Sequence, residues 1–326
     1  MRRYKVWLSI VVLSCFAAGI INPASADLVY ANSTSSNQLS NWKYETRSDG
    51  TIGILEYIGE DLDVSVPSKI EGKYVTSIGE NAFYAKHLDH VVVPEGVLSI
   101  GDYSFAYSTL RSISLPESLL SIGIGAFSYS DVNSISIPSG VKHISTSTFA
   151  ESVLEEISLP NGLVSIGDAA FFECNLLSVD IPETVKSIGA GAFALCSNLR
   201  SITIPDSVLS MGDDPFMGCS RLRRVVVSPN HPYLFTEGDV LFSKPDKRLI
   251  WCSPAVVRDV YKVPEGTWVI GDDAFGFCDY LTIEIPNSVT SIGYLAFNNT
   301  QTLIVYHNSY AEQYCKENNL SYRYAN

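Results

Sequence analysis

Histidine, cysteine and aspartate are the residues of this chain whose chemistry could support catalysis or metal binding. His87 and His90 flank Asp89, but no cysteine or carboxylate cluster completes a set of metal ligands around them. Cys252 and His231 could be paired as a nucleophile and its base, but nothing in their spacing supports that pairing. No G-x-S-x-G, Walker or dinucleotide-binding motif is found. From the sequence we therefore expect a protein that is not an enzyme and that has no metal site and no cofactor.

Four cysteines recur at a fixed spacing, each three residues after a phenylalanine: Cys174, Cys196, Cys219 and Cys278. If the phenylalanines mark successive coils of a stack, neighbouring side chains lie about 4.8 Å apart and point the same way. The Cβ atoms of a relaxed disulfide lie about 3.8 Å apart, so this spacing is slightly too long. We interpret these cysteines as small buried hydrophobic residues and expect mostly free thiols. Cys252 and Cys315 lie outside this position and could be free or paired.

Acidic residues follow a recurrent glycine and include two adjacent pairs, Asp213-Asp214 and Asp272-Asp273. A carboxylate at this position can cap the short helical turn that carries the next alanine and phenylalanine. This capping role explains the pairs better than a metal site does.

Nine near-copies of one segment position these residues, with the pattern S-I-G-x-x-A-F-x-x-C-x-x-L-x-x-I-x-I-P. Its phenylalanine recurs at Phe83, Phe105, Phe127, Phe149, Phe171, Phe193, Phe216, Phe275 and Phe297. The first six lie 22 residues apart, and the later steps are 23, 59 and 22 residues. A fixed period in the twenties is typical of a solenoid, whose repeats bury their apolar side chains only against neighbours. We therefore expect one repeat domain.

Alternating apolar residues precede a proline in most repeats, as in Leu110, Ile113 and Leu115 before Pro116. This alternation predicts a short strand that ends at the proline, which cannot donate the next ladder bond. Stacked coils would pair these strands into a parallel sheet along one face, with short turns or 3-10 segments on the other. The recurrent glycine, as at Gly101, indicates either a positive φ or a close approach of the backbone.

The pattern also predicts the order of segments along the chain. An N-terminal hairpin cap over 42–76 precedes repeats over 77–227, a two-stranded excursion over 228–262 and further repeats over 263–300. A C-terminal cap over 301–326 should hold a helix, which begins at a capping box of Ser309 and Glu312, and a final strand.

Residues 1–26 read as a secretory signal peptide, with a charged start, an apolar stretch and cleavage after Ala26, followed by a flexible polar lead over 27–41. A membrane anchor or a lipoprotein signal at Cys15 fits the segment less well. No other stretch is apolar enough to span a membrane. Cleavage would change the net charge from −13 to −16, because the segment holds three basic residues and no acidic ones. This charge argues against nucleic acid and anionic membranes as partners.

The repeat resembles the BspA-like leucine-rich repeats of secreted and surface proteins, as in 185–193 and 199–205, over about residues 42–324. Two copies depart from the pattern, at 145–148 and at Met211 with Pro215. The resemblance implies a right-handed parallel solenoid of the leucine-rich-repeat type. It also implies adhesin-type attachment to an extracellular or surface protein or glycan. The expected localisation is secreted or at the cell surface. The alternative is a structural protein that assembles with itself.

Two groups of residues are the candidate ligand-binding positions. The outward strand positions form a small, hydroxyl-rich face that could offer hydrogen bonds or could simply keep a stacked sheet soluble: Ser112, Ser114, Ser134, Ser136, Glu156, Ser158, Ser178, Asp180, Ser201 and Thr203. The excursion supplies aromatic residues that could be exposed contacts or, more favoured, a small core under the hairpin: Tyr233, Phe235, Phe242 and Trp251.

Overall fold

The structure is a computed structural model that describes residues 39–254, 259–278, 282–298 and 300–325. The expected signal peptide and residues 27–38 of the expected polar lead lie outside the described residues. Residues 39–41, also expected in that lead, form a 3-10 helix, η1 (Leu39–Asn41), at the start of the first coil.

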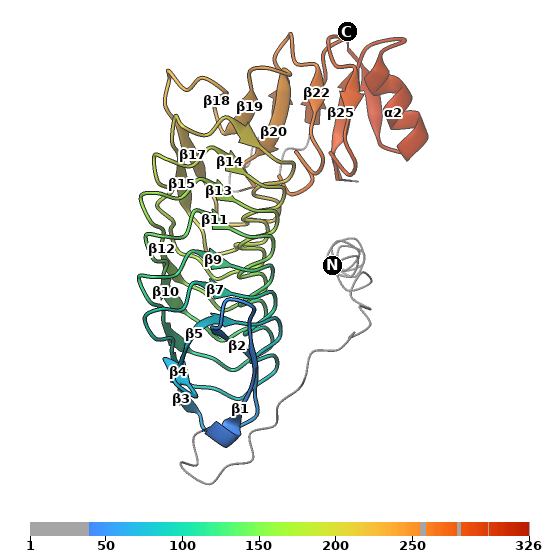
Figure 1. The fold of residues 1–326 in the computed structure, drawn as a ribbon. Coiled ribbons are helices and arrows are strands. Elements are labelled where there is room, and N and C mark those ends of the chain that lie inside the picture. The colour runs from blue at the N-terminus through green and yellow to red at the C-terminus, as the bar shows by residue number, and fades with distance from the viewer. Residues whose placement is uncertain (1–38, 255–258, 279–281, 299, 326) are drawn as a thin grey trace. The chain divides into compact units, whose positions relative to one another are not determined.

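One row of short parallel strands runs along the stack where the alternating residues predict it (Figure 1). We call it the proline row, because most of its strands end one or two residues before a proline. Its strands are β3 (Asp63–Ser65), β6 (His90–Val92), β8 (Ser112–Ser114), β10 (Ser134–Ser136), β12 (Glu156–Ser158), β15 (Ser201–Ile204), β17 (Arg224–Val227), β21 (Val260–Lys262), β23 (Thr282–Glu284), β25 (Thr302–Val305) and β26 (Tyr322–Tyr324). The coil between β12 and β15 has no strand at 178–180, where the alternation predicted one.

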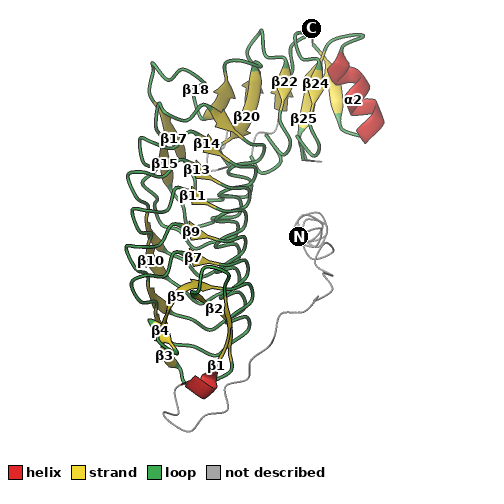
Figure 2. Cartoon of the chain, viewed as in Figure 1, coloured by secondary structure: helices red, strands yellow, loops and turns green. Residues whose placement is uncertain are grey.

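A second row of parallel strands lies directly before the recurrent glycine, where only a turn was expected. We call it the glycine row. Its strands are β5 (Lys73–Ile78), β7 (Ser99–Ile100), β9 (Ser121–Ile122), β11 (His143–Ile144), β13 (Ser165–Ile166), β14 (Ser187–Ile188), β16 (Ser210–Met211), β22 (Val269–Ile270) and β24 (Ser291–Ile292). Most coils therefore carry strands on two faces, and loops join them (Figure 2).

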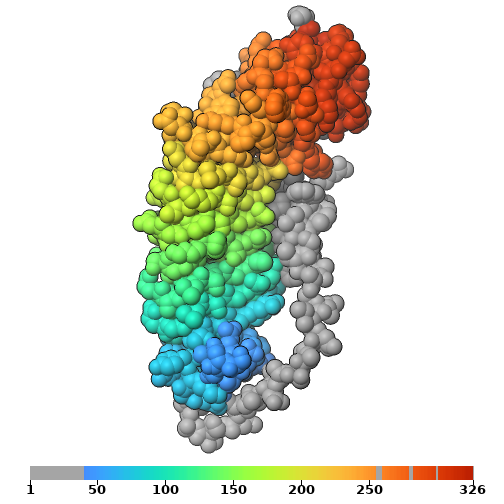
Figure 3. All heavy atoms as spheres, turned by 45° about the horizontal axis from the view of Figure 1, so that its top comes forward, coloured from blue at the N-terminus to red at the C-terminus, as the bar shows by residue number. Residues whose placement is uncertain are grey.

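The stacking of phenylalanine rings forms the centre of the core. From Phe83 to Phe216, successive ring centroids lie 4.7–5.9 Å apart and the rings are nearly parallel. Phe275 and Phe297 repeat the arrangement at 5.5 Å after the excursion. Each ring contacts the ring one repeat earlier and one repeat later, so sequence order and spatial order coincide along the stack (Figure 3).

The recurrent glycine is explained by close approach, because none of the glycines at this position has a positive φ. A Cβ atom on Gly101 would lie 2.7 Å from the amide nitrogen of Glu80 in the preceding coil. The left-handed residues lie instead two positions before and two after the phenylalanine, and they include Tyr103 and Tyr107 (φ 52° and 57°). In this turn, every second amide, such as that of Phe105, donates to a carbonyl of the next coil.

The acidic residue after the glycine was expected to cap a helical turn of its own coil, and this expectation is wrong. Instead, Oδ1 of Asp102 accepts a hydrogen bond from the amide of Ile124 in the next coil, at 2.7 Å. Asp168 and Asp272 make the same bond to the next coil, at 2.8 and 2.7 Å. These carboxylates therefore join neighbouring coils.

The N-terminal hairpin is confirmed. Strand β1 (Trp42–Thr46) pairs antiparallel with β2 (Ile52–Tyr57), and β2 pairs parallel with β5, while β4 (Lys69–Ile70) lies antiparallel to β5. Trp42 and Tyr57 pack on Phe83 with ring centroids 5.8 and 5.5 Å away. The hairpin therefore covers the first ring of the phenylalanine stack.

The excursion has three strands, where two were predicted. Strands β18 (Leu234–Glu237), β19 (Val240–Ser243) and β20 (Arg248–Cys252) form an antiparallel sheet, and the predicted turn joins β19 to β20. Arg248 and Leu249 of β20 then pair in parallel with β22. The last strand of the excursion is therefore also a strand of the glycine row.

The C-terminal cap is the predicted helix and strand. Helix α2 (Tyr310–Asn318) starts at Ser309, whose side chain accepts from the amide of Glu312. Glu312 accepts from the amide of Asn308 at 2.6 Å, one residue earlier than a standard capping box. The helix ends at Asn319, which has a left-handed backbone. Strand β26 then pairs in parallel with β25 and closes the proline row.

Removing a ring from the middle of the stack should strongly destabilise the protein. Phe149 is fully buried between Phe127 and Phe171. We expect Phe149→Ala to lower the free energy of unfolding by about 3–5 kcal/mol, measured by urea denaturation. Phe235→Ala is the control, because that side chain is 37% exposed. Equal losses in the two variants would contradict the role given to the ring stack.

Candidate binding surface

The outward side chains of the proline row form the hydroxyl face predicted from the sequence. All ten predicted positions from Ser112 to Thr203 are exposed. Parallel pairing places Ser134 beside Glu156 and Ser136 beside Ser158, so equivalent positions follow one another from coil to coil. Ser178 and Asp180 are exposed but lie on a loop, because their coil has no strand there.

The hydroxyl groups of this face are largely unused by the protein. Ser112 bonds the ring of His90 at 2.8 Å across neighbouring strands. In the described part of the chain, the hydroxyls of Ser114, Ser134, Ser136 and Ser158 have no protein hydrogen-bond partner. These four exposed groups can therefore donate to and accept from a ligand or water.

The same face continues beyond the predicted positions and changes its chemistry. Lys262 and Glu284 lie two residues before Pro264 and Pro286, at the position that the serines of the hydroxyl face occupy in earlier coils, so the sequence pattern could have identified them. Their side chains form an ion pair at 2.8 Å, and the hydrogen bond from Lys262 holds the pKa of Glu284 below its ordinary value. The face is thus hydroxyl-rich before the excursion and charged after it.

The aromatic residues of the excursion divide between core and surface. Phe242 and Trp251 are buried, and the Trp251 ring meets Phe216 edge-on at 5.7 Å. Phe235 stacks on Phe242 at 5.0 Å and remains 37% exposed, while Tyr233 is half-buried. Phe242 and Trp251 therefore form a small core under the hairpin and are not exposed contacts, whereas part of Phe235 remains at the surface.

His231 has a structural role in the excursion. Its Nδ1 accepts from the amides of Tyr233 and Leu234 at 3.1 and 3.0 Å, so Nε2 carries the proton and donates to the carbonyl of Pro205 at 3.0 Å. Burial lowers the pKa of this imidazole. Both ring nitrogens bond backbone groups, and neither serves as the base of a nucleophile pair with Cys252.

The cysteines lie in the core and bond to the backbone. All six cysteines of the described residues are buried, and none of them forms a disulfide. The thiols of Cys174, Cys196 and Cys219 each donate to the phenylalanine carbonyl of the preceding coil at 3.0 Å. Burial raises the pKa of Cys174 and Cys219 to about 12, so these thiols are not nucleophiles at neutral pH.

The two aspartate pairs lie on either side of the excursion. Asp213 pairs with Arg248 of β20, and Arg248 also pairs with Asp246 at 2.7 Å. Oδ1 of Asp214 and Oδ1 of Asp273 are buried and have no hydrogen-bond partner among the described residues. Burial, together with repulsion from neighbouring carboxylates, raises the pKa of Asp214 to about 8 and that of Asp273 to about 7. Over those same residues, no cluster of three potential metal ligands is found.

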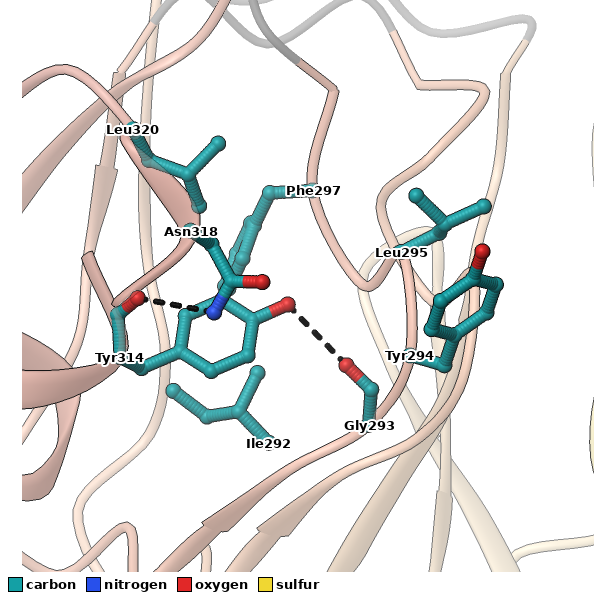
Figure 4. A pocket seen from close by; sticks show the side chains of 8 residues that line it. All are labelled: Ile292, Gly293, Tyr294, Leu295, Phe297, Tyr314, Asn318 and Leu320. Atoms are coloured by element: carbon teal, nitrogen blue, oxygen red, sulfur yellow. Dashed lines mark hydrogen bonds between the residues drawn. The ribbon is translucent and has the colours of Figure 1, made fainter. Parts of the chain in front are cut away.

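A small pocket lies between helix α2 and the last coil of the glycine row (Figure 4). Its volume is about 220 Å³, and its walls are mostly apolar, with Ile292, Phe297 and Leu320 among them. Tyr314 donates to the carbonyl of Gly293 at 3.1 Å, and this bond ties the helix to the coil. No sequence pattern predicted this pocket, because its walls come from the last coil and from the helical cap, which meet only in the fold.

The comparisons with known proteins agree with this architecture. The BspA type leucine rich repeat region matches residues 76–197, 142–237 and 260–318, which cover more than half of the chain. A leucine rich cell surface protein from Faecalibacterium prausnitzii has a similar structure, with a TM-score of 0.63 and 21% identity over 87% of this chain and 78% of its own.

Two further structures share the fold. The pneumococcal vaccine antigen PcpA has a TM-score of 0.59 and 21% identity over 86% of this chain and 73% of its own. A leucine-rich repeat protein from Eubacterium ventriosum has a TM-score of 0.54 and 20% identity over 82% of this chain and 71% of its own. The search of curated proteins found no match.

Trp251 is expected to stabilise the fold rather than to bind a ligand. Its side chain is 5% exposed and ends the first phenylalanine stack. We expect Trp251→Ala to lower the free energy of unfolding by about 3–5 kcal/mol, measured by urea denaturation. Trp268→Ala is the matched control, because that indole is 51% exposed. An unchanged unfolding midpoint for Trp251→Ala would contradict the buried role.

The raised pKa values of Asp214 and Asp273 predict that stability falls as pH rises. The folded state holds these protons more tightly than the unfolded state, whose aspartates titrate near pH 3.9. The contribution of these two groups to the unfolding free energy should therefore decline from about pH 4 to about pH 8. Asp214→Asn should raise the melting temperature at pH 8 and change it little at pH 4.5, whereas the exposed Asp131→Asn should do neither. A shift of equal size at both pH values would show that Asp214 is ionised in the folded protein.

The repeats, the two strand rows and the cysteine position all match one architecture, and the chain belongs to the BspA-type leucine-rich repeat family.

Proposed function

We propose that this protein is a non-catalytic binding protein at or outside the cell surface. On this proposal, the hydroxyl face of the proline row recognises a protein or glycan partner. The observation that supports it most directly is the row of exposed serine hydroxyls, Ser114, Ser134, Ser136 and Ser158, which the fold itself does not use. A face built on paired strands loses little conformational freedom on association, so more of the interaction energy remains as affinity.

Two further observations support a role at the surface. The first 26 residues have the composition of a secretory signal. The similar structure from Faecalibacterium prausnitzii is described as a cell surface protein. In the described part of the chain, neither helix has the length and hydropathy needed to cross a bilayer.

The buried side chains support the non-catalytic part of the proposal. His231 bonds backbone groups through both ring nitrogens, and the thiols of Cys174 and Cys219 are protonated at neutral pH. All three of these side chains are buried. They therefore serve the core of this fold.

The proposal is tested by binding of purified residues 27–326 to arrays of matrix proteins and glycans at physiological salt. We expect a saturable hit that Ser114→Arg, Ser136→Arg and Ser158→Arg together abolish, because three long charged side chains would cover the hydroxyl face. Ser121→Arg, Ser210→Arg and Ser291→Arg are the matched control, since these exposed serines belong to the glycine row.

Two outcomes would count against the proposal. Binding that survives substitution of the proline row but fails in the control would place the site on the other face. A folded protein that binds nothing on the arrays and forms a large, stable oligomer by light scattering would favour the alternative, a self-assembling structural protein.

A further inference from the structure

The residues directly before the strands of the glycine row form a second exposed surface, whose chemistry differs from that of the hydroxyl face. The residue three positions before the recurrent glycine is exposed in six consecutive coils. These residues, which we call the Leu/Lys column, are Leu98, Leu120, Lys142, Val164, Lys186 and Leu209. Backbone hydrogen bonds join its members from coil to coil, as from Leu120 to Leu98 and from Lys186 to Val164.

The apolar members of the column are unusually exposed for their type. Leu98, Leu120, Val164 and Leu209 are 43%, 56%, 37% and 55% exposed. The residue that follows each of these four is a serine, whose side chain is shorter. Apolar residues aligned in this way are typical of a contact surface.

The charged members of the column are both basic, in a chain with 35 acidic and 22 basic residues. In the described part of the chain, neither Lys142 nor Lys186 has a carboxylate oxygen within 4.0 Å. The ammonium of Lys142 donates to the backbone carbonyl of Ser139 at 3.1 Å, which leaves its charge without a counter-ion. Two lysines therefore face solvent without an ion-pair partner between exposed apolar side chains.

We propose that the Leu/Lys column docks an acidic amphipathic helix of another polypeptide. The lysines, which have no ion-pair partner, favour a partner with carboxylates, and the exposed leucines and valine favour one with apolar side chains. The step between coils is about 4.8 Å, close to the helix pitch of about 5.4 Å, whereas same-face residues of a strand lie about 6.8 Å apart. A helix can therefore present about one side chain to each coil. A glycan fits less well, because aliphatic side chains offer it no hydrogen bonds.

The probe is a fluorescein-labelled synthetic helix of about 20 residues, with leucine and glutamate alternating on successive turns of one face. Its binding to residues 27–326 is followed by fluorescence anisotropy at low and at physiological salt. We expect saturable binding that weakens with salt. A peptide with lysine in place of each glutamate should bind at least about tenfold more weakly.

Two sets of variants separate charge from apolar contact. Lys142→Glu with Lys186→Glu should weaken binding about tenfold or more, whereas Arg200→Glu with Arg223→Glu makes the same charge change on exposed residues outside the column and should leave binding unchanged. Leu120→Ser with Leu209→Ser should also weaken binding. Because both leucines are more than half exposed, this pair should keep the melting temperature of the parent.

The proposal is overturned if the acidic and basic peptides bind equally, if neither binds, or if the Arg200 and Arg223 variant loses binding as the lysine variant does. Two results together would identify the column as a polyanion site instead. Heparin at equal charge concentration would displace the acidic peptide, and the leucine variant would bind the peptide as well as the parent does. The arginine substitutions in the proline row should not change peptide binding, so this test does not depend on the proposed role of the hydroxyl face.

Discussion

Contact between neighbouring phenylalanine rings is the interaction on which the rest of this structure depends. A coil of 22 residues cannot bury its own apolar side chains, so each one needs a neighbour on both sides. The rings of Phe83 to Phe216 meet this need at centroid spacings of 4.7–5.9 Å. The strand rows, the aspartate bonds and the buried thiols all serve to hold successive coils in the same register around that stack.

A stack of this kind must be closed wherever it ends, and aromatic residues do this in each case. Trp42 and Tyr57 of the N-terminal hairpin cover Phe83, and Tyr314 of α2 meets Phe297 at 6.2 Å. At the excursion, Trp251 ends the first stack on Phe216 and Tyr261 begins the second beside Phe275. The hairpin, the helix and the excursion therefore differ in local structure, but each covers an end of a phenylalanine stack.

Because the inward residues and the backbone ladders hold the coils together, the outward residues are free to differ between faces. The proline row carries short hydroxyl side chains, whereas the Leu/Lys column beside the glycine row carries exposed leucines and lysines that have no ion-pair partner. Recognition of partners can therefore be built on either face without changing the core. The excursion offers less surface for binding than its aromatic content indicated, because Phe242 and Trp251 are buried in its own core.

The sequence by itself determined the repeat period, the core phenylalanines, most of the proline-row strands, both caps and the hydroxyl positions. The strands and the hydroxyl positions follow from alternation within one repeat, the period from the spacing between repeats, and the caps from local hairpin and helix-capping patterns. Only the tertiary structure decided the second strand row, the third strand of the excursion, the bonds from Asp102 and Asp168 to the next coil, and the juxtaposition of Asp214 with Asp273. These features depend on how coils 22 or more residues apart are aligned. A two-residue strand has no periodicity of its own, so its ladder exists only once its neighbours are stacked beside it.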